Sequence, residues 1–367
     1  GAWAEVLPDL TRQGVDKVLI SAIRAFAFSI LVRHPEENIT EAKALEAYSS
    51  ALLSVHETLD APQRPSPVEL IAAVMCLLFA ELILTTTLES WAAHLEGLGK
   101  LIQTCEPEYF SSGIPHRLFV GARPALVVLA IQSRKSSFLT LEQWKVVPFR
   151  EIVPSSMQVL LGEAAMLPSL IERLDKLSGA DLEVAKVELR ELMASRSRLE
   201  AWEIGFLTTR EHPRVRYDVP GGYGTLWFDS LTTANGLTHA WSFNVICLAN
   251  IERIASHFPE LSNDIGIARS EISREKKRLS IMICQSMEYL VQDNMKLFGP
   301  MSGILPLQTA FEAFRDGGSE TMAELRWCEE MLMVYFKTFP FLSLFFHNFW
   351  DAKSVSTTTS ILKVVQV

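Results

Sequence analysis

The chain is organised around Val68–Thr104, which reads VELIAAVMCLLFAELILTTTLESWAAHLEGLGKLIQT. Between Leu70 and Leu84 nearly every residue is apolar, so the pattern predicts a helix covered by protein on all sides. The second part of the stretch predicts an amphipathic helix, with apolar positions repeating every three or four residues. Its apolar side consists of Trp91, His94, Leu95, Leu98, Leu101 and Ile102, and its polar side of Glu96, Lys100 and Gln103. Other helices must pack against both.

Composition sets limits on the class of protein. The chain has 367 residues, of which 49% are hydrophobic, so a large core can form. Its net charge is −9, which disfavours direct binding of nucleic acid by this segment. Its five cysteines are far apart and form no CxxC motif or Cys/His cluster, so we expect neither disulfides nor a metal site, and no motif indicates a cofactor. An intracellular, reducing compartment fits this cysteine usage.

The apolar run Val68–Leu88 is long enough to cross a bilayer. It contains Glu69 and Glu81 and lacks basic flanks, and a carboxylate inside lipid is costly, so we expect a buried helix and no membrane contact. No signal peptide is visible. Because the chain begins at Gly1 and not at Met, we expect the natural N-terminus to lie upstream.

Helical periodicity runs through the rest of the chain and predicts an all-α fold of about a dozen or more helices in one continuous domain. Strand-like alternation is nearly absent, and one helix is expected over 156–177. The predicted domain spans 1–350, and 351–367 is expected to be a flexible tail. Two prolines interrupt the helical pattern at 148–156, where the domain could divide into two sub-domains.

Residues 212–236, HPRVRYDVPGGYGTLWFDSLTTANG, interrupt the helical rhythm. Their glycines allow unusual backbone angles, while Tyr223, Trp227 and Phe228 are too apolar to stay in water. The stretch is expected to fold over another part of the protein, either as a lid over a cavity or as a surface turn packed by its own rings. PGGYG is not a phosphate loop, because no Lys-Ser/Thr pair follows it.

Four ionisable residues are candidates for catalysis. Glu81 lies in the apolar run LLFAELIL and needs a partner there, for which Arg123 in another apolar helix is a candidate. His94 lies on an apolar stripe, and Asp229 and His239 border the glycine-rich stretch. For Glu81 the structural alternative is an ion pair, and for His94 it is a hydrogen-bonded histidine in the core. No sequence motif marks a nucleophile beside Asp229 and His239.

Aromatic and sulfur-containing residues crowd the later helices. Such side chains can line a pocket for an apolar ligand, and they are equally the material of a core. The candidate ligand-binding residues are Arg123, Tyr223, Trp227, Phe228, Trp241, Phe243, Met287 and Tyr289.

The run Arg274, Lys276, Lys277 and Arg278 is the tightest basic cluster in the sequence. Glu271 and Glu275 are interleaved with it at helical spacing. This pattern favours a solvated helix face that pairs with itself over an interaction patch.

Several blocks occur in an order that resembles a known family. ESWAAHLEGLGKLIQ, HRLFVGARPALVVLAIQSRKSSF and the region of Trp144 and Pro148 come first. LTHAWSFNVICLANIERI, IMICQSMEYLV, and GILPLQTAFEAF with Arg326 and Trp327 follow. Over roughly residues 16–340 they resemble the regulatory domain that follows the Zn2Cys6 DNA-binding region in fungal transcription factors.

This resemblance implies an all-helical regulatory domain that binds an apolar small molecule or a protein partner and works in the nucleus, with a homodimer as one further option. The six-cysteine DNA-binding cluster of the family is absent from this sequence, so either it lies upstream or the protein has none. The second case leaves open a cytoplasmic, cofactor-independent enzyme of fungal secondary metabolism, a cyclase or pericyclase that holds an apolar substrate in a reactive fold. A helical scaffold for protein partners is a third hypothesis.

Overall fold

A computed structural model describes residues 3–12, 17–33, 35–60, 66–84, 88–177, 181–208, 215–218, 222–338 and 346. Helices dominate these residues, and the predicted all-α class is confirmed. The chain forms two compact units. Unit 1 comprises Gly1–Gln132 and Phe138–Pro154, and unit 2 comprises Ser133–Ser137 and Ser155–Val367. The prediction of one continuous domain is not tested by this division and stays a prediction, and the expected tail 351–367 lies outside the described residues.

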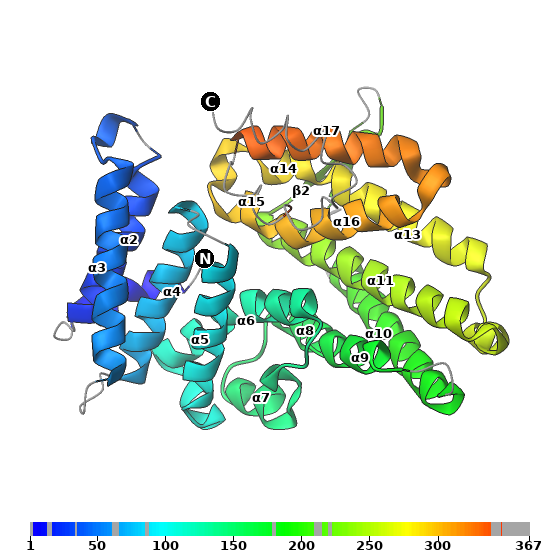
Figure 1. Cartoon of the computed structure of the whole chain (residues 1–367), viewed down its shortest axis with the longest axis horizontal. Coiled ribbons are helices and arrows are strands. Elements are labelled where there is room, and N and C mark those ends of the chain that lie inside the picture. The colour runs from blue at the N-terminus through cyan, green and yellow to red at the C-terminus, as the bar shows by residue number, and fades with distance from the viewer. Residues whose placement is uncertain are drawn as a thin grey trace. The chain divides into compact units, whose positions relative to one another are not determined.

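Unit 1 is an array of helices in which α2 packs against α3 and α4, and α4 against α5 (Figure 1). Its helices are α1 Leu7–Arg12, α2 Lys17–Leu31, α3 Glu41–Asp60, α4 Pro67–Leu84, α5 Leu88–Gln103, α6 Gly113–Ser133 and α7 Glu142–Val146. The stretch Val68–Thr104 therefore forms two successive helices, α4 and α5, as predicted.

The helix α4 is the centre of the unit 1 core. Its buried residues lie on every side, because the sequence offers hardly any polar position to turn outward. On α5 the predicted apolar side is turned inward, with Leu95, Leu98 and Ile102 fully buried. A second cluster of rings surrounds α6, where Phe119 lies 5.4 Å from Phe110, just before the helix, and 5.8 Å from Trp144 on α7 between ring centroids.

Both α4 and α6 are long and apolar enough to cross a membrane by composition. In this structure 67% of the α4 window and 50% of the α6 window are buried within the protein. The core helix of a soluble protein passes the same test, so these two helices do not by themselves indicate a membrane protein. The expected absence of membrane contact stays a prediction.

Unit 2 is built on two long helices, with α10 packed on α11, and α11 on α13 and α16. Its helices are α8 Ser156–Ala164, α9 Leu167–Asp175, α10 Leu182–Thr208, α11 Leu231–His257, α12 Ser262–Ile265, α13 Arg269–Gln285, α14 Met287–Leu290, α15 Phe298–Ser302, α16 Ile304–Asp316 and α17 Met322–Thr338. In Figure 1, α16 and α17 lie beside α13.

The single helix expected over 156–177 is two helices in the structure. The helix α8 ends at Ala164, and α9 begins at Leu167 with Pro168 in its first turn. Proline lacks the backbone N–H and disfavours helical geometry in the preceding residue, so Pro168 starts a new helix more readily than it continues an old one.

The glycine-rich stretch contains a two-stranded antiparallel hairpin, β1 Val215–Asp218 and β2 Thr225–Phe228. Leu226 and Phe228 are buried while Thr225 and Trp227 are half-buried, the alternation of a strand with one covered face. The helix α11 begins at Leu231, inside the stretch 212–236 that was predicted to be a loop, because Ser230 caps it by accepting from the Thr233 N–H.

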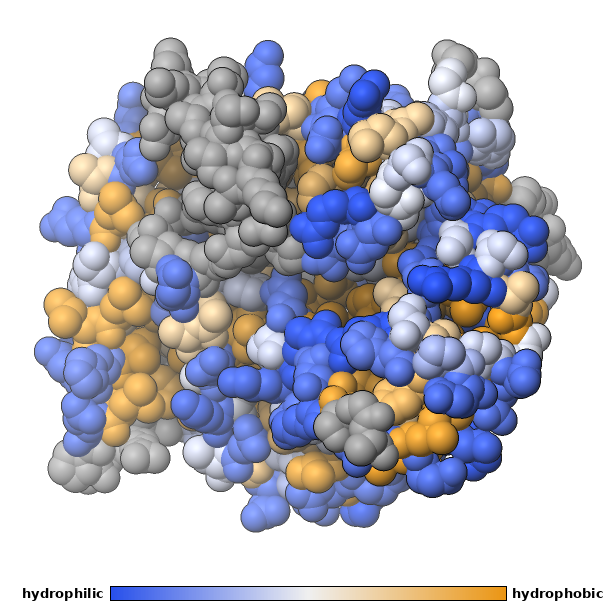
Figure 2. Space-filling model, turned by 45° about the vertical axis from the view of Figure 1, so that its right-hand side comes forward, coloured by the Kyte–Doolittle hydropathy of each residue, from blue (hydrophilic) through white to orange (hydrophobic). Residues whose placement is uncertain are grey.

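Exposed apolar residues are spread over several helices. Figure 2 shows one face of the molecule, on which hydrophilic side chains cover much of the surface and hydrophobic ones appear in separate areas. Among the described residues, the exposed apolar side chains include Leu53 on α3, Ile204 on α10 and Val334 on α17. Scattered exposed apolar residues are normal for a globular protein and do not alone define a site.

Candidate functional site

Three helices of unit 1 bring a carboxylate, a phenol and an imidazole together. Glu81 on α4 accepts a hydrogen bond from the hydroxyl of Tyr48 on α3, and the Tyr48 Oη lies 2.7 Å from Nε2 of His94 on α5. The direction of the hydrogen bond between Tyr48 and His94 depends on the histidine tautomer, and His94 is the donor when the one proton of the hydroxyl points to Glu81. We call this group the polar chain.

Burial controls the chemistry of the polar chain. Glu81 is 1% exposed and Tyr48 is 4% exposed, whereas His94 is half-buried. Burial, with Glu81 beside it, raises the pKa of Tyr48, so the phenol stays protonated. Burial also lowers the pKa of His94, although the charge of Glu81 opposes that change. At neutral pH the polar chain therefore contains a protonated phenol and a neutral imidazole.

The sequence pointed to Glu81 and His94 separately, and the structure connects them through Tyr48, which sequence reasoning missed. The position of Tyr48 in the sequence could have indicated its role, because it lies on the buried side of α3 with Ala44, Ala51 and Val55. A tyrosine on a core stripe must find a partner for its hydroxyl. That requirement could have led to Glu81.

Arg123 lies in the interior of unit 1, on α6. It is 1% exposed, and its guanidinium carbon lies 5.0 Å from the ring centre of Phe149 and 5.9 Å from that of Phe119. Burial lowers the pKa of Arg123 to about 10. The guanidinium is therefore held partly by aromatic faces. The proposed pairing of Arg123 with Glu81 stays a prediction.

In unit 2 the hairpin is held to neighbouring helices by side-chain contacts around Tyr223. The Tyr223 ring stacks on Trp327 of α17 at 4.2 Å between centroids, and its hydroxyl lies 3.3 Å from Oε1 of Glu324. The Tyr223 carbonyl accepts hydrogen bonds from Gln285 of α13 and, at 3.0 Å, from the hydroxyl of Tyr217 in β1. We call these contacts the hairpin latch.

Gly224 lies next to the hairpin latch and has a φ of +72°. A Cβ at this position would lie 2.8 Å from the carbonyl oxygen of Asp218 and 2.8 Å from the hydroxyl oxygen of Tyr217. Both the left-handed backbone and the close approach require glycine here. Gly224 therefore serves the turn of the hairpin.

The second strand packs its rings against α14. Tyr289 makes edge-to-face contacts with Phe228 at 5.2 Å and with Trp227 at 6.0 Å between centroids. At the outer end of the strand, the hydroxyl of Thr225 donates to Glu288 at 2.7 Å. The structure thus brings together four of the predicted ligand-binding residues, Tyr223, Trp227, Phe228 and Tyr289, around one hairpin.

The other predicted ligand-binding residues of unit 2 lie in its core. Trp241 is 1% exposed on α11, and Phe243 and Met287 are equally buried. The Met287 sulfur accepts from the Tyr335 hydroxyl at 3.3 Å. An apolar ligand could reach these three side chains only if the surrounding helices moved.

Asp229 and His239 are each engaged with local partners. Asp229 accepts from the hydroxyls of Ser230 and Thr233 at the start of α11. His239 lies next to the Asn235 carbonyl oxygen, with Nδ1 at 2.9 Å, and burial lowers its pKa to about 4. These contacts give Asp229 a structural role just before α11 and His239 one within it, and no result tests the predicted catalytic role.

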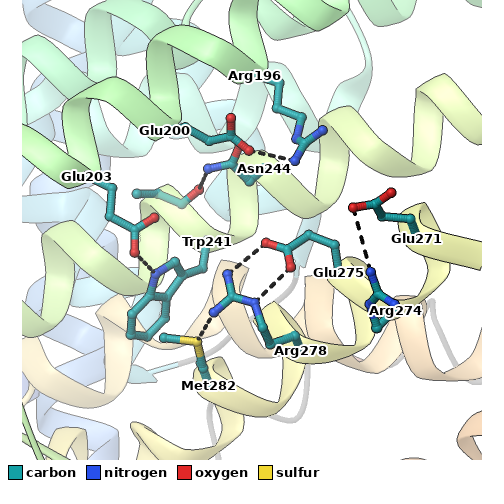
Figure 3. A network of polar contacts seen from close by, with 11 residues as sticks. Arg196, Glu200, Glu203, Trp241, Asn244, Glu271, Arg274, Glu275, Arg278 and Met282 are labelled. Atoms are coloured by element: carbon teal, nitrogen blue, oxygen red, sulfur yellow. Dashed lines mark hydrogen bonds and ion pairs between the residues drawn. The ribbon is translucent and has the colours of Figure 1, made fainter. Parts of the chain in front are cut away.

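A polar network crosses α10, α11 and α13 (Figure 3). Glu203 accepts the Trp241 indole N–H at 2.7 Å, and burial raises the pKa of Glu203. On α13, Arg278 makes two hydrogen bonds to Glu275, at 2.8 and 2.7 Å. Arg196 pairs with Glu200 on α10 at 2.6 Å. Glu203 thus connects the network to the core of unit 2 through its hydrogen bond with buried Trp241.

The basic run on α13 pairs partly with itself, as its interleaved glutamates predict. Arg274 pairs with Glu271, and Arg278 with Glu275. The two lysines differ from the prediction. Lys276 is buried and pairs with Glu252 on α11, and Lys277 pairs with Glu324 on α17 at 2.9 Å. The run therefore also ties α13 to its neighbours.

Among the residues that the structure describes, no group of three or more His, Cys, Asp or Glu side chains could hold a metal ion. The chemistry visible in the described part of the chain is that of hydrogen bonds, ion pairs and ring contacts. The polar chain of unit 1 and the hairpin latch of unit 2 are its two most specific arrangements.

The fold and these arrangements define a helical protein with two polar side-chain assemblies, one in each unit. Residues 6–140 match the family model described as the fungal specific transcription factor domain. The resemblance inferred from the sequence is confirmed over those residues, which include the polar chain and helices α1 to α6. Neither a curated protein nor a solved structure gave a significant match. The family match indicates a regulatory role and an intracellular, nuclear setting.

Proposed function

We propose that this chain is the regulatory part of a fungal transcription factor and that it works by binding an effector, without chemical turnover. The observation that carries the proposal is the family match over residues 6–140. The effector is a protein partner or an apolar small molecule. Its binding changes the conformation of unit 2.

The hairpin of unit 2 is the element best suited to change position. A two-stranded hairpin is only marginally stable alone, so its place depends on the side chains that hold it. At the turn and on β1 those contacts lie at half-buried or exposed residues, Tyr223 and Tyr217, whereas β2 buries Phe228 against Tyr289. Segments with few buried contacts open at low free-energy cost, and switching elements are drawn from such segments.

Exposure favours a protein partner over a small molecule as the effector. Tyr217 is 56% exposed on the hairpin, and Trp227 is half-buried, so both rings can be touched from outside. The residues that would enclose an apolar ligand, Trp241, Phe243 and Met287, are packed in the core. Aromatic side chains are enriched at the centres of protein interfaces.

The size of the required effect is modest. An effector that favours one position of the hairpin over another by about 1–3 kcal/mol changes the ratio of the two populations by about five- to 150-fold. Loss of the ring stack between Tyr223 and Trp327 has an energy of about 0.5–1.5 kcal/mol, which overlaps the lower end of this range. Competition for those rings would be enough.

The test is to fuse the chain to an unrelated DNA-binding domain and to measure a reporter gene in a fungal cell. We expect the output to differ by about fivefold or more from that of the DNA-binding domain alone. Equal outputs at equal protein abundance would contradict a regulatory role. Native mass spectrometry of the protein purified from those cells would show whether a protein or a small molecule is retained.

A second candidate function, a cofactor-independent enzyme, is favoured by one observation. Tyr48 and His94 form a hydrogen-bonded pair next to a buried carboxylate, and the neutral imidazole of such a pair can accept a proton from a bound substrate. Incubation with apolar polyene or polyketide substrates tests this candidate. A product that forms with the wild type and not with Tyr48→Phe would favour the enzyme, and identical product profiles with and without protein would remove it.

A further inference from the structure

The segment Ser133–Ser137, which we call the strap, follows α6 and belongs by its contacts to unit 2, although the residues on both sides of it belong to unit 1. It reads SRKSS, and Arg134, Lys135 and Ser136 are exposed. Arg134 has a φ of +54°, a backbone conformation that side-chain-bearing residues rarely adopt. Contacts made by the strap must hold it in this conformation.

An ion-pair cluster ties the strap to α9 and α11. Arg134 donates from Nε and Nη2 to the two carboxylate oxygens of Asp175, both at 2.7 Å. Arg253 of α11 approaches the same carboxylate at 2.8 Å. The Arg134 hydrogen bonds, with Arg253 adding to them, lower the pKa of Asp175 to about 2. A forked pair of this geometry holds both position and orientation.

A second carboxylate fixes the next part of the strap. The backbone N–H of Ser136 donates to Oε2 of Glu172 at 2.8 Å, and Lys176 pairs with Glu172 at 2.7 Å. Lys135 adds to the positive charge around Glu172. The Ser136 side chain is therefore exposed beside a fixed negative charge and directly after two cationic residues.

We propose that Ser136 is a phosphorylation site for a kinase that selects basic residues before the acceptor, and that its modification releases the strap from α9. In the reaction the Ser136 Oγ bonds to the γ-phosphorus of magnesium-bound ATP. The bond from that phosphorus to the β–γ bridging oxygen breaks, and ADP leaves with the electron pair. The hydroxyl proton passes to the base of the kinase.

Two electrostatic effects produce the release. A phosphoserine carries about −1.5 to −2 charges at neutral pH and would lie next to Glu172, so the two groups repel each other. Its oxygens also attract Arg134, which then leaves Asp175. Both effects weaken contacts that hold the strap, and neither strengthens a contact that the structure shows.

The site is tested by incubating the full chain with magnesium, ATP and a purified serine kinase that selects arginine two residues before the acceptor. We expect phosphate on Ser136, located by mass spectrometry. The Ser136→Ala variant should lose about tenfold or more of the incorporation, while Ser137→Ala should keep it. Phosphate on Ser133 or Ser137, or no incorporation into the strap, would overturn the assignment.

The release is tested on the same protein by hydrogen exchange of the Ser136 amide, measured as protection relative to a phosphorylated unstructured peptide of the same sequence. Stoichiometric phosphorylation should lower this protection about tenfold. In Glu172→Gln, which keeps an acceptor but removes the charge, the loss should be smaller. Unchanged protection in the phosphorylated wild-type protein would overturn the release.

Discussion

The two units use polar side chains in opposite ways. In unit 1 the polar chain of Glu81, Tyr48 and His94 lies inside, between α3, α4 and α5, where burial strengthens each contact and makes the loss of any one costly. In unit 2 the ring stack of the hairpin latch, Tyr223 on Trp327, lies at half-buried positions, where water can replace part of what is lost. The first arrangement connects three helices, whereas the second holds the hairpin that we propose to be the switching element.

If the two units differ only at the hairpin, the interior of unit 2 is as closely packed as that of unit 1. Phe243 is fully buried on α11, so Phe243→Ala should lower the free energy of unfolding by about 3–5 kcal/mol. Chemical denaturation provides the measurement, and Leu53→Ala at an exposed position of α3 is the control, with a change below about 0.5 kcal/mol. A loss below about 1 kcal/mol would indicate that Phe243 lines a cavity instead of filling the core.

The pH dependence of stability tests the environment of His239 in the core of unit 2. His239 is 6% exposed and its pKa is lowered from 6.5 to about 4, so the unfolded chain binds the proton more readily than the folded one. Stability should therefore be complete above about pH 6.5, fall as the pH drops towards 4, and level off below that, with a total loss of about 3 kcal/mol. For His94 the sign is the same, but Glu81 opposes the change.

Denaturation of His239→Gln between pH 4 and 7 checks this contribution. The variant should lose most of the slope, whereas His257→Gln, at an exposed position of the same helix, should keep it. Equal slopes in the wild type and His239→Gln would mean that His239 is not held neutral by burial.

Removing the hydroxyl at the centre of the polar chain tests the role of unit 1. Tyr48→Phe deprives buried Glu81 of a donor and should cost about 1–3 kcal/mol of stability. The matched control is Tyr109→Phe, which removes a hydroxyl from an exposed ring. If both variants unfold at the same denaturant concentration as the wild type, the polar chain is not what fixes α3, α4 and α5.

The smallest expected effect belongs to the hairpin latch. Tyr223→Leu removes the stack on Trp327, and a double-mutant cycle with Trp327→Leu should give a coupling energy of about 0.5–1.5 kcal/mol. Hydrogen exchange of the β2 amides should accelerate in either single variant. Coupling near zero would show that the two rings touch without holding the hairpin.

Much of unit 1 could be predicted from sequence because its signals are local. The run around Leu77 has no polar side, so it had to become a core helix, and the amphipathic stretch after it had to pack against that core. Those patterns show which face of a helix is buried but not which residue meets it. The contact of Tyr48 with Glu81 and His94 depends on how three helices are packed, which no spacing within one helix encodes.

In unit 2 the sequence identified the unusual stretch but not its form. Glycines and rings indicated a segment that folds over another element, whereas β1 is too short and too exposed to show the alternation of a strand. Met287, Trp241 and Phe243 illustrate a second limit. Apolar composition is the same for a core as for a ligand pocket, and only packing distinguishes them.

The most direct test of the account compares one variant from each unit in the reporter assay, in the chain fused to an unrelated DNA-binding domain. At equal protein abundance, Tyr223→Leu should change the output by about fivefold or more, because the hairpin position carries the signal, while Tyr48→Phe should leave it at the wild-type level. If Tyr223→Leu and the wild type give the same output, the hairpin is not the switching element and the regulatory account of unit 2 is wrong.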